Sequence, residues 1–268
     1  MAIHPGSLLL LTAAAVISGT NPPRWQPQAI GGILVRGGAN TRDVGPYSFS
    51  LTTFSPRGSL TQIEYAINSA QAGALSAAAC YNGGVVVASI CKTESPLVRE
   101  TGTRKIAHVT DGCCVLLYSG LAADSRVLTK KAMDAALEYR GKYGERALVP
   151  VVTLVSKVAM VMQEHTQMGG VRPFGVILLV AGVDLDGPQL YKVEPSGSFS
   201  AWKCLAVGKG SLAAEAMLHE GFEEKMDRDR ALELVLSVLQ KSSSGTGRED
   251  IETAFIEEGP TVAVDRRG

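Results

Sequence analysis

Apolar residues between positions 59 and 119 change from helical spacing to the patterns typical of strands. Ser59–Ala72 places apolar side chains at helical intervals, and Pro56 with Gly58 predicts a turn directly before it. Two pairs of β-rich runs follow, joined at Asn82-Gly83, which favours a type I′ turn, and around Asp111-Gly112. The four predicted strands are Leu75–Tyr81, Val85–Ile90, Lys105–Val109 and Val115–Ser119. This half of the chain therefore predicts antiparallel sheet.

The remaining apolar residues predict two helix pairs separated by strands. The first pair covers Leu121 to about Tyr143 and Val151–Gln167, with Gly169-Gly170 ending its second helix. Strands are predicted at Gly175–Gly182, Gln189–Glu194 and around Phe199–Val207. They are followed by helices Ser211–Lys225 and Asp227–Lys241, with Asp227 as N-cap, a loop Ser242–Gly247 and a last strand Ile251–Ile256. Hairpins interrupted by helix pairs predict an α+β fold with helices packed outside sheets, and the order lacks the alternation of a Rossmann sheet.

The first 46 residues differ from the rest of the chain. Ser7–Ser18 is an apolar run that imitates a signal-peptide core, but it is too short to span a membrane and no Lys or Arg precedes it. The Pro- and Gly-rich stretch after it is typical of a disordered linker. A targeting segment, a disordered extension and a misplaced start codon all remain open. We expect residues 1–46 to be an extension and residues 47–268 to be the folded domain.

Composition excludes several classes of partner and site. The 268 residues are 46% hydrophobic, and 26 basic residues balance 26 acidic ones, so no overall field favours nucleic acid or an anionic membrane. Five cysteines without a Cys-x-x-Cys pair or a histidine at ligand spacing favour a reducing compartment without structural zinc. We therefore expect no metal and no cofactor.

The usual catalytic fingerprints are incomplete. Gly208–Ser211 lacks the first glycine of a phosphate loop, and His219 with Glu220 lacks the second histidine of a zinc protease. His108 and His165 are more typical of structural histidines than of bases. Cys113-Cys114 lies in an apolar run, where buried thiols are more common than nucleophiles.

One segment carries a specific motif. Phe54-Ser55-Pro56-Arg57-Gly58-Ser59-Leu60-Thr61-Gln62-Ile63-Glu64-Tyr65-Ala66 resembles the signature of proteasome alpha subunits at each of its fixed positions. The resemblance extends through Tyr118-Ser119-Gly120, Gly169–Gly175, Pro195-Ser196-Gly197 and Ala201-Trp202-Lys203, and covers about residues 47 to 258. The start at Tyr47 and the stretch from Met162 to Gly175 are most similar to alpha type-2 members of the family.

The resemblance implies a fold and a role. The family fold is a four-layer αββα sandwich, two antiparallel sheets between helix layers, as in N-terminal-nucleophile hydrolases. Its alpha subunits are non-catalytic: seven form a ring that stacks on a beta ring and controls entry to a proteolytic chamber. The implied partners are other alpha subunits, beta subunits, and the regulatory particle or other activators, in cytoplasm and nucleus, without nucleic acid or membrane.

The resemblance also implies candidate site residues. Pore gating falls on Tyr47, Ser48 and Phe49, where the family often has Tyr-Asp-Arg, and on the turn at Pro56 and Gly58. Cys80 stands where alpha subunits commonly have a lysine that pairs with the carboxylate of activator tails, so docking there is expected to be weakened. Either the pocket is disabled or a nearby lysine such as Lys92 restores the charge.

Two alternatives from other classes remain. The chain could be an N-terminal-nucleophile or cysteine hydrolase acting on its own, using Cys113 or Cys114. It could also be a binding module outside the proteasome.

Overall fold

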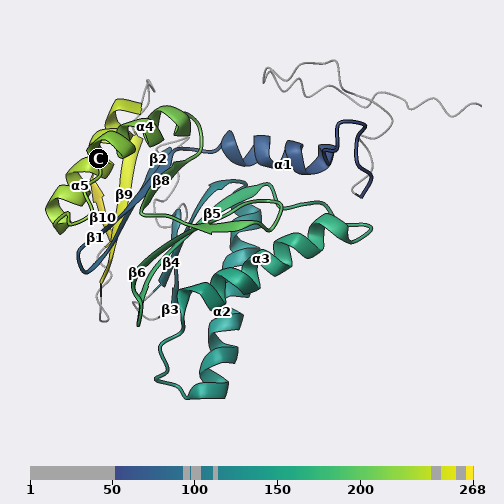
Figure 1. Ribbon diagram of the computed structural model, residues 1–268, viewed down its shortest axis with the longest axis horizontal. Helices are drawn as coiled ribbons and strands as arrows, with labels where there is room; N and C mark the ends of the chain where they lie inside the picture. The colour runs from purple at the N-terminus through teal and green to yellow at the C-terminus, as the bar shows by residue number, and fades with distance from the viewer. Residues whose placement is uncertain are drawn as a thin grey trace, which may run out of the picture. The chain divides into compact units, whose positions relative to one another are not determined.

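A computed structural model describes residues 52–92, 97, 104–110, 114–242, 249–257 and 264–267 (Figure 1). These residues belong to one compact unit. Its helices are α1 (Thr61–Gln71), α2 (Ala122–Tyr143), α3 (Val151–Gln167), α4 (Ser211–Gly221) and α5 (Arg228–Ser242). Its strands are β1 (Ser76–Tyr81), β2 (Gly84–Lys92), β3 (Ile106–Thr110), β4 (Cys114–Gly120), β5 (Val176–Asp184), β6 (Gly187–Val193), β7 (Phe199–Ala201), β8 (Cys204–Val207), β9 (Glu249–Glu257) and β10 (Val264–Arg267).

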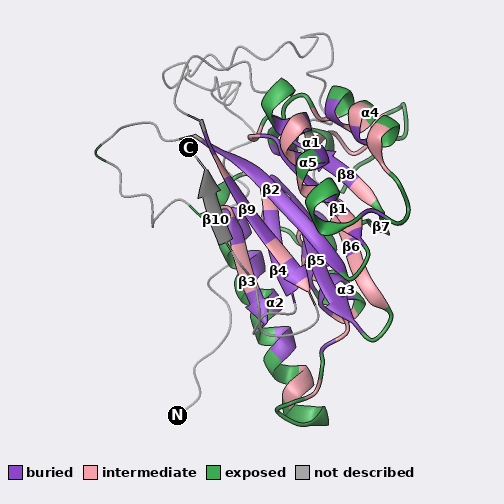
Figure 2. Ribbon diagram, turned by 90° about the vertical axis from the view of Figure 1, so that its left-hand side faces the viewer, coloured by how far each residue is buried: buried purple, intermediate pink, exposed green. Residues whose placement is uncertain are grey.

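The strands form two five-stranded sheets. One has the order β10-β9-β2-β1-β8 and the other the order β3-β4-β5-β6-β7, and every pairing is antiparallel. The inner strands are covered on both faces; each residue of β5 is buried, and Figure 2 shows the same for much of β1, β2 and β4. Strands of this kind have continuous apolar runs because neither face meets water.

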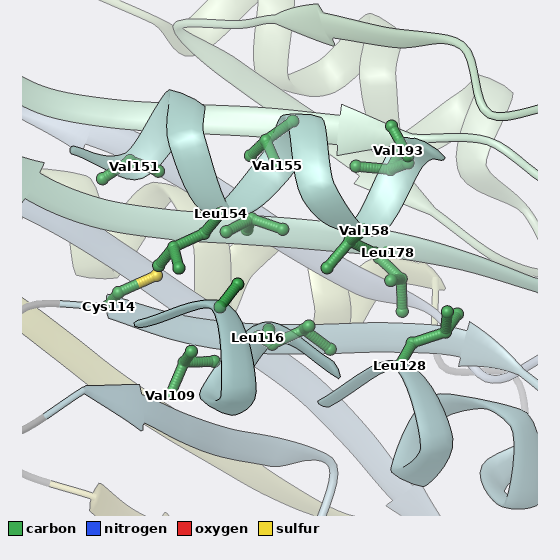
Figure 3. Packing of buried hydrophobic residues seen from close by; sticks show 14 of the residues in the cluster. Val109, Cys114, Leu116, Leu128, Val151, Leu154, Val155, Val158, Leu178 and Val193 are labelled. Carbon is green, nitrogen blue, oxygen red and sulfur yellow. The ribbon is translucent and has the colours of Figure 1, made fainter. Parts of the chain in front are cut away.

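Three apolar clusters separate the layers. One lies between the two sheets, with members such as Val87 and Leu179. A second joins α2 and α3 to β4 and β5 and includes Leu128, Leu154 and Leu178 (Figure 3). The third packs α4 and α5 on β1 and β2. The order helices, sheet, sheet, helices confirms the predicted four-layer αββα sandwich.

Most predicted elements are confirmed with small shifts of their ends. The helices α1, α2, α3 and α5 and the strands β1 to β6 and β9 lie where the sequence places them, and Asp227 directly precedes α5. The predicted turn at Asp111-Gly112 and most of the Ser242–Gly247 loop lie outside the described residues. Strand β10 was not predicted. Among the described residues, no helix has both the length and the apolar character needed to cross a membrane.

Three local predictions are wrong. The hairpin at Asn82-Gly83 is not type I′, because among the described residues only glycines have positive φ, and that turn needs it at Asn82 as well. The run around Phe199–Val207 is two strands, β7 and β8, which belong to different sheets. Helix α4 ends at Gly221 rather than Lys225.

Candidate functional site

The turn before α1 is held by its own hydrogen bonds. The Gly58 amide donates to the Ser55 carbonyl at 2.8 Å, and the two hydroxyls of Ser55 and Ser59 are 2.9 Å apart. Pro56 takes the second position of this turn, where its fixed φ is favourable. Gly58 has φ +80° with no atom near its missing Cβ, so glycine is required here by conformation rather than by space. The predicted turn is therefore confirmed.

Helix α1 is fastened at its carboxyl end. The Ser119 hydroxyl donates to the Ala70 carbonyl at 2.9 Å, and the Lys209 amide donates to the Gly73 carbonyl at 2.8 Å. A Cβ on Gly73 would lie 2.3 Å from the Gly120 amide nitrogen, so the chain passes close against β4 at this point. The segment between α1 and β1 is thus packed against β4 at Gly73, whereas Ala72 before it is exposed.

The start of β1 offers no activated nucleophile. The Ser76 hydroxyl lies 2.7 Å from that of Ser89, and both residues are fully buried. A nucleophile of this kind would need a base beside it, and the contact is with another neutral hydroxyl. The hydrogen bond therefore has a structural role.

Cys80 lies half-buried on β1, beside the connection between β7 and β8. Its amide donates to the Lys203 carbonyl at 2.8 Å, and its thiol lies 3.8 Å from the Trp202 carbonyl oxygen. Burial, with a smaller contribution from Cys204, raises the pKa of the Cys80 thiol to about 12. The thiol is therefore neutral at physiological pH and cannot act as a cation or as a thiolate nucleophile.

A cavity of about 280 Å³ opens beside Cys80. It is lined by Cys80, Tyr81, Pro188, Lys203, Phe222, Glu224 and Lys225. Two cations thus face it, although Lys203 forms an ion pair with Glu224. Sequence reasoning missed both lysines because they come from the distant segments before β8 and after α4.

Lys92 does not restore the charge at Cys80. Cys80 pairs with Val85 in the β1–β2 hairpin, whereas the backbone of Lys92 pairs with Glu249 at the far end of β2. Seven residues of an extended strand span roughly 23 Å, which is beyond the reach of a lysine side chain. The alternative that named Lys92 is therefore wrong.

The other predicted candidates are structural or lie elsewhere. Cys114 is buried among leucines and valines of the α2–α3 cluster (Figure 3), and Cys113 lies outside the described residues. Gly210 forms the N-cap of α4, and His165 contacts the Val161 carbonyl from within α3. Tyr47, Ser48 and Phe49 also lie outside the described residues. No group of metal-binding side chains occurs in the described ranges.

Comparison with known proteins identifies the family. Residues 71–256 match the model of the family described as Proteasome subunit, and residues 47–68 match the model of the N-terminal signature of A-type proteasome subunits. The chain belongs to the proteasome subunit family. The signature covers the turn and most of α1, and the larger match extends from the end of α1 to β9.

Individual relatives of this proteasome-family chain are alpha subunits. It is 46% identical to the alpha type-2-A proteasome subunit of Arabidopsis thaliana over 199 residues, which are 74% of this chain and 83% of the relative. It is 43% identical to the probable alpha type-2 proteasome subunit of Schizosaccharomyces pombe, over 80% of this chain and 87% of the relative. It is 44% identical to the alpha type-2 proteasome subunit of Saccharomyces cerevisiae, over 81% of this chain and 87% of the relative. The resemblance to alpha type-2 members is thereby confirmed.

Proposed function

We propose that this chain is a non-catalytic alpha-ring subunit of the proteasome core particle, serving ubiquitin-dependent protein degradation. The observation that carries the proposal is the signature segment, which here folds as a turn and helix α1 directly before β1. The proposed partners are six further alpha subunits in the ring, the beta subunits, and the regulatory particle or other activators. We place the complex in cytoplasm and nucleus, with no nucleic-acid or membrane partner.

The position of α1 argues against catalysis by this chain. A terminal threonine nucleophile needs a free amino group at the start of the first strand. Here α1 leads through Gly73 directly into β1, and Gly73 is closely packed against Gly120. The hydrolase alternative has less support, because Cys114 lies in the apolar core and Cys80 has a raised pKa.

Assembly is the first prediction. We expect the tagged chain to elute from gel filtration of a cell extract in a very large particle, together with other alpha and beta subunits. The purified chain alone should not hydrolyse a fluorogenic peptide above the level of a Cys113→Ala, Cys114→Ala variant. A chain that elutes as a small protein, or that hydrolyses the peptide steadily, contradicts the proposal.

The segment before α1 is proposed to help close the pore. Truncation up to Phe49 is expected to increase peptide hydrolysis by assembled particles in the absence of activators, because the segment would no longer obstruct entry. The increase should be modest, since other alpha subunits also contribute to the gate. Truncation up to residue 46 is the matched control, since it keeps Tyr47, Ser48 and Phe49. The prediction fails if the two truncated chains give equal rates.

The extension before Tyr47 is proposed to lie outside the functional domain, 47–268. Intact-mass measurement of the native subunit determines whether residues 1–46 are present, and therefore which full-length chain the gate experiment should use as its reference.

Docking of activator tails is proposed to be weak at the Cys80 cavity. Cys80→Lys is expected to strengthen binding of an activator-tail peptide to assembled particles by about ten- to a hundredfold. An ammonium donates charge-assisted hydrogen bonds of roughly 1.5 to 3 kcal/mol, whereas a neutral thiol is a weak donor. Peptide affinity is measured by fluorescence anisotropy.

Two variants separate the possible outcomes of the docking experiment. Cys80→Ser keeps the approximate size and the neutrality of the side chain and should strengthen binding much less than Cys80→Lys does, because a neutral hydroxyl supplies no charge-assisted hydrogen bond. Lys203→Ala removes a cation that already lines the cavity. If Cys80→Lys has no effect while Lys203→Ala weakens binding, Lys203 replaces the family lysine and the prediction for Cys80 is wrong.

A further inference from the structure

A second cavity lies where α2 packs on β3 and β4. Its volume is about 240 Å³. Its walls come from the residues just before and within β3, from β4 and from the first turns of α2. The nine lining residues are Arg104, Lys105, Ala107, Tyr118, Ser125, Arg126, Thr129, Lys130 and Met133.

The lining is strongly basic. Arg104 and Lys105 are consecutive, and Arg126 and Lys130 lie one turn apart on α2, so four cationic side chains surround one small space. None of the nine lining residues carries a carboxylate. Cations gathered in this way repel one another, and an anion among them removes that repulsion. The charge of the cavity therefore favours an anionic ligand.

Lys105 is the least solvated of the four cations. Burial lowers the pKa of its ammonium group, while Cys91 and Glu252 oppose that shift. Glu252 does not line the cavity but offsets part of the Lys105 charge; its Oε2 accepts the Lys105 backbone amide at 2.9 Å and lies 3.5 Å from the Cys91 thiol. The Lys105 ammonium lies 5.5 Å from the centre of the Tyr118 ring. An anion in the cavity would replace part of the hydration that this ammonium has lost.

The hydrogen-bond donors of the cavity can also be assigned. The Ser125 hydroxyl donates to the Ala122 carbonyl at 2.8 Å, and the Thr129 hydroxyl donates to the Ser125 carbonyl at 2.8 Å. These two hydroxyls are therefore used within α2. Burial raises the pKa of Tyr118, although Arg126 opposes the shift, so its phenol is protonated at neutral pH. The Tyr118 side chain is itself hydrogen-bonded to Ser125, so the side-chain donors left for a ligand are the four cations.

We propose that this cavity binds a phosphate group, either in a short free polyphosphate or in a phosphate monoester. A phosphate dianion offsets more of the charge than a single carboxylate does, and the planar guanidinium groups of Arg104 and Arg126 suit its oxygens. At roughly 30 Å³ per water, the cavity has room for about eight waters, which is enough for a phosphate group and part of its hydration shell. The site does not depend on the ring role proposed above.

Adjacent lysines on α2 provide a matched test. Inorganic pyrophosphate is titrated into the full-length chain by calorimetry in low salt. Lys130→Ala is expected to weaken binding about tenfold, because it removes one charge-assisted contact. Lys131→Ala removes the same charge from the next residue, which is exposed and does not line the cavity, and should leave the affinity within about twofold. Arg126→Lys keeps the charge but loses the planar pair of N–H donors of the guanidinium group. Its affinity for pyrophosphate should lie between those of Lys130→Ala and Lys131→Ala.

Three peptides distinguish the sources of the phosphate. They share one sequence and carry phosphoserine, serine or glutamate at the central position. Binding of the phosphoserine peptide alone, with the same loss in Lys130→Ala, supports a phosphate monoester as ligand; binding of pyrophosphate alone supports a free polyphosphate. The proposal is overturned if neither probe binds, if Lys130→Ala and Lys131→Ala weaken binding equally, or if the glutamate peptide binds as tightly as the phosphoserine peptide.

Discussion

Gly120→Ala is expected to destabilise the chain by about 2 to 6 kcal/mol, which is a large part of the stability of a typical domain. Gly120 has φ +113°, which costs roughly 1 to 3 kcal/mol for any other residue. A Cβ here would lie 2.3 Å from the Gly175 carbonyl oxygen and 2.9 Å from the Ala70 Cα. Both are backbone atoms, so no side chain can move aside, and overpacking adds roughly 1 to 3 kcal/mol.

Urea unfolding of the purified chain, followed by circular dichroism, measures this loss. Gly141→Ala is the matched control, because Gly141 lies within α2 with no atom near its missing Cβ. There the same change should raise stability by about 0.5 to 1 kcal/mol, since alanine favours helix. Equal effects of the two substitutions would show that the junction of α1, β4 and β5 is less tightly packed than the distances indicate.

Asp124→Ala is expected to lower the free energy of unfolding by about 2 to 4 kcal/mol. The carboxylate accepts two hydrogen bonds from the Arg172 guanidinium, at 2.7 and 2.8 Å, and one from the Gly175 amide at 2.9 Å. Its side chain is only 8% exposed, whereas that of Arg172 is 63% exposed. Removal of Asp124 therefore leaves the buried Gly175 amide without this acceptor, while Arg172 can turn to water.

Arg172→Ala should cost less than Asp124→Ala, because the bond from Gly175 to Asp124 remains. The exposed pair of Glu138 and Lys142 is the control, and Glu138→Gln should change stability by less than about 0.5 kcal/mol. If Arg172→Ala costs as much as Asp124→Ala, the ion pair rather than the buried amide carries the energy.

The same carboxylate predicts a pH dependence. The hydrogen bonds from Arg172, together with that from Gly175, lower the pKa of Asp124, although burial opposes the shift. A group whose pKa is lower in the folded state contributes its stability above its unfolded pKa, about 3.9, and loses it as the pH falls through the folded value. The stability difference between the parent and Asp124→Asn should therefore be largest at neutral pH and shrink below about pH 4. A difference that does not change with pH contradicts this assignment.

The spacing of apolar residues predicted where helices and strands lie better than it predicted which strands pair with one another. Helices α2 and α3 bury one stripe each, so their spacing is visible in the sequence. The run from Phe199 to Val207 gave no sign that its two halves pair with different sheets, because hydrogen-bond partners depend on tertiary contacts. Helix α4 ends at Gly221, and Phe222 after it has an extended backbone with φ −79° and ψ 130°. Gly221 lies close to Leu234, where a Cβ would lie 2.4 Å from Leu234 Cδ1, and that contact is not encoded in local spacing.

The candidate site was predictable in part. The turn at Pro56 and Gly58 follows from residue types that favour it, and its hydrogen bonds agree. The environment of Cys80 could not be predicted, because Lys203 and Lys225 reach it from two separate connections, before β8 and after α4. The basic cavity at α2 combines Arg104 and Lys105 with Arg126 and Lys130, and only the packing of α2 on β3 brings the two pairs together.

The passage from β7 to β8 limits how the two sheets can move. The Trp202 amide donates to the Leu190 carbonyl and so continues the ladder of one sheet, while the Lys203 carbonyl accepts from the Cys80 amide and continues the ladder of the other. A single peptide bond therefore separates the two ladders. Only the backbone dihedral angles of Trp202 and Lys203 lie between the two hydrogen bonds, so shear between the sheets at this edge has no loop to absorb it and strains the ladder bonds. A load applied to the Cys80 cavity would thus be transmitted directly from one sheet to the other.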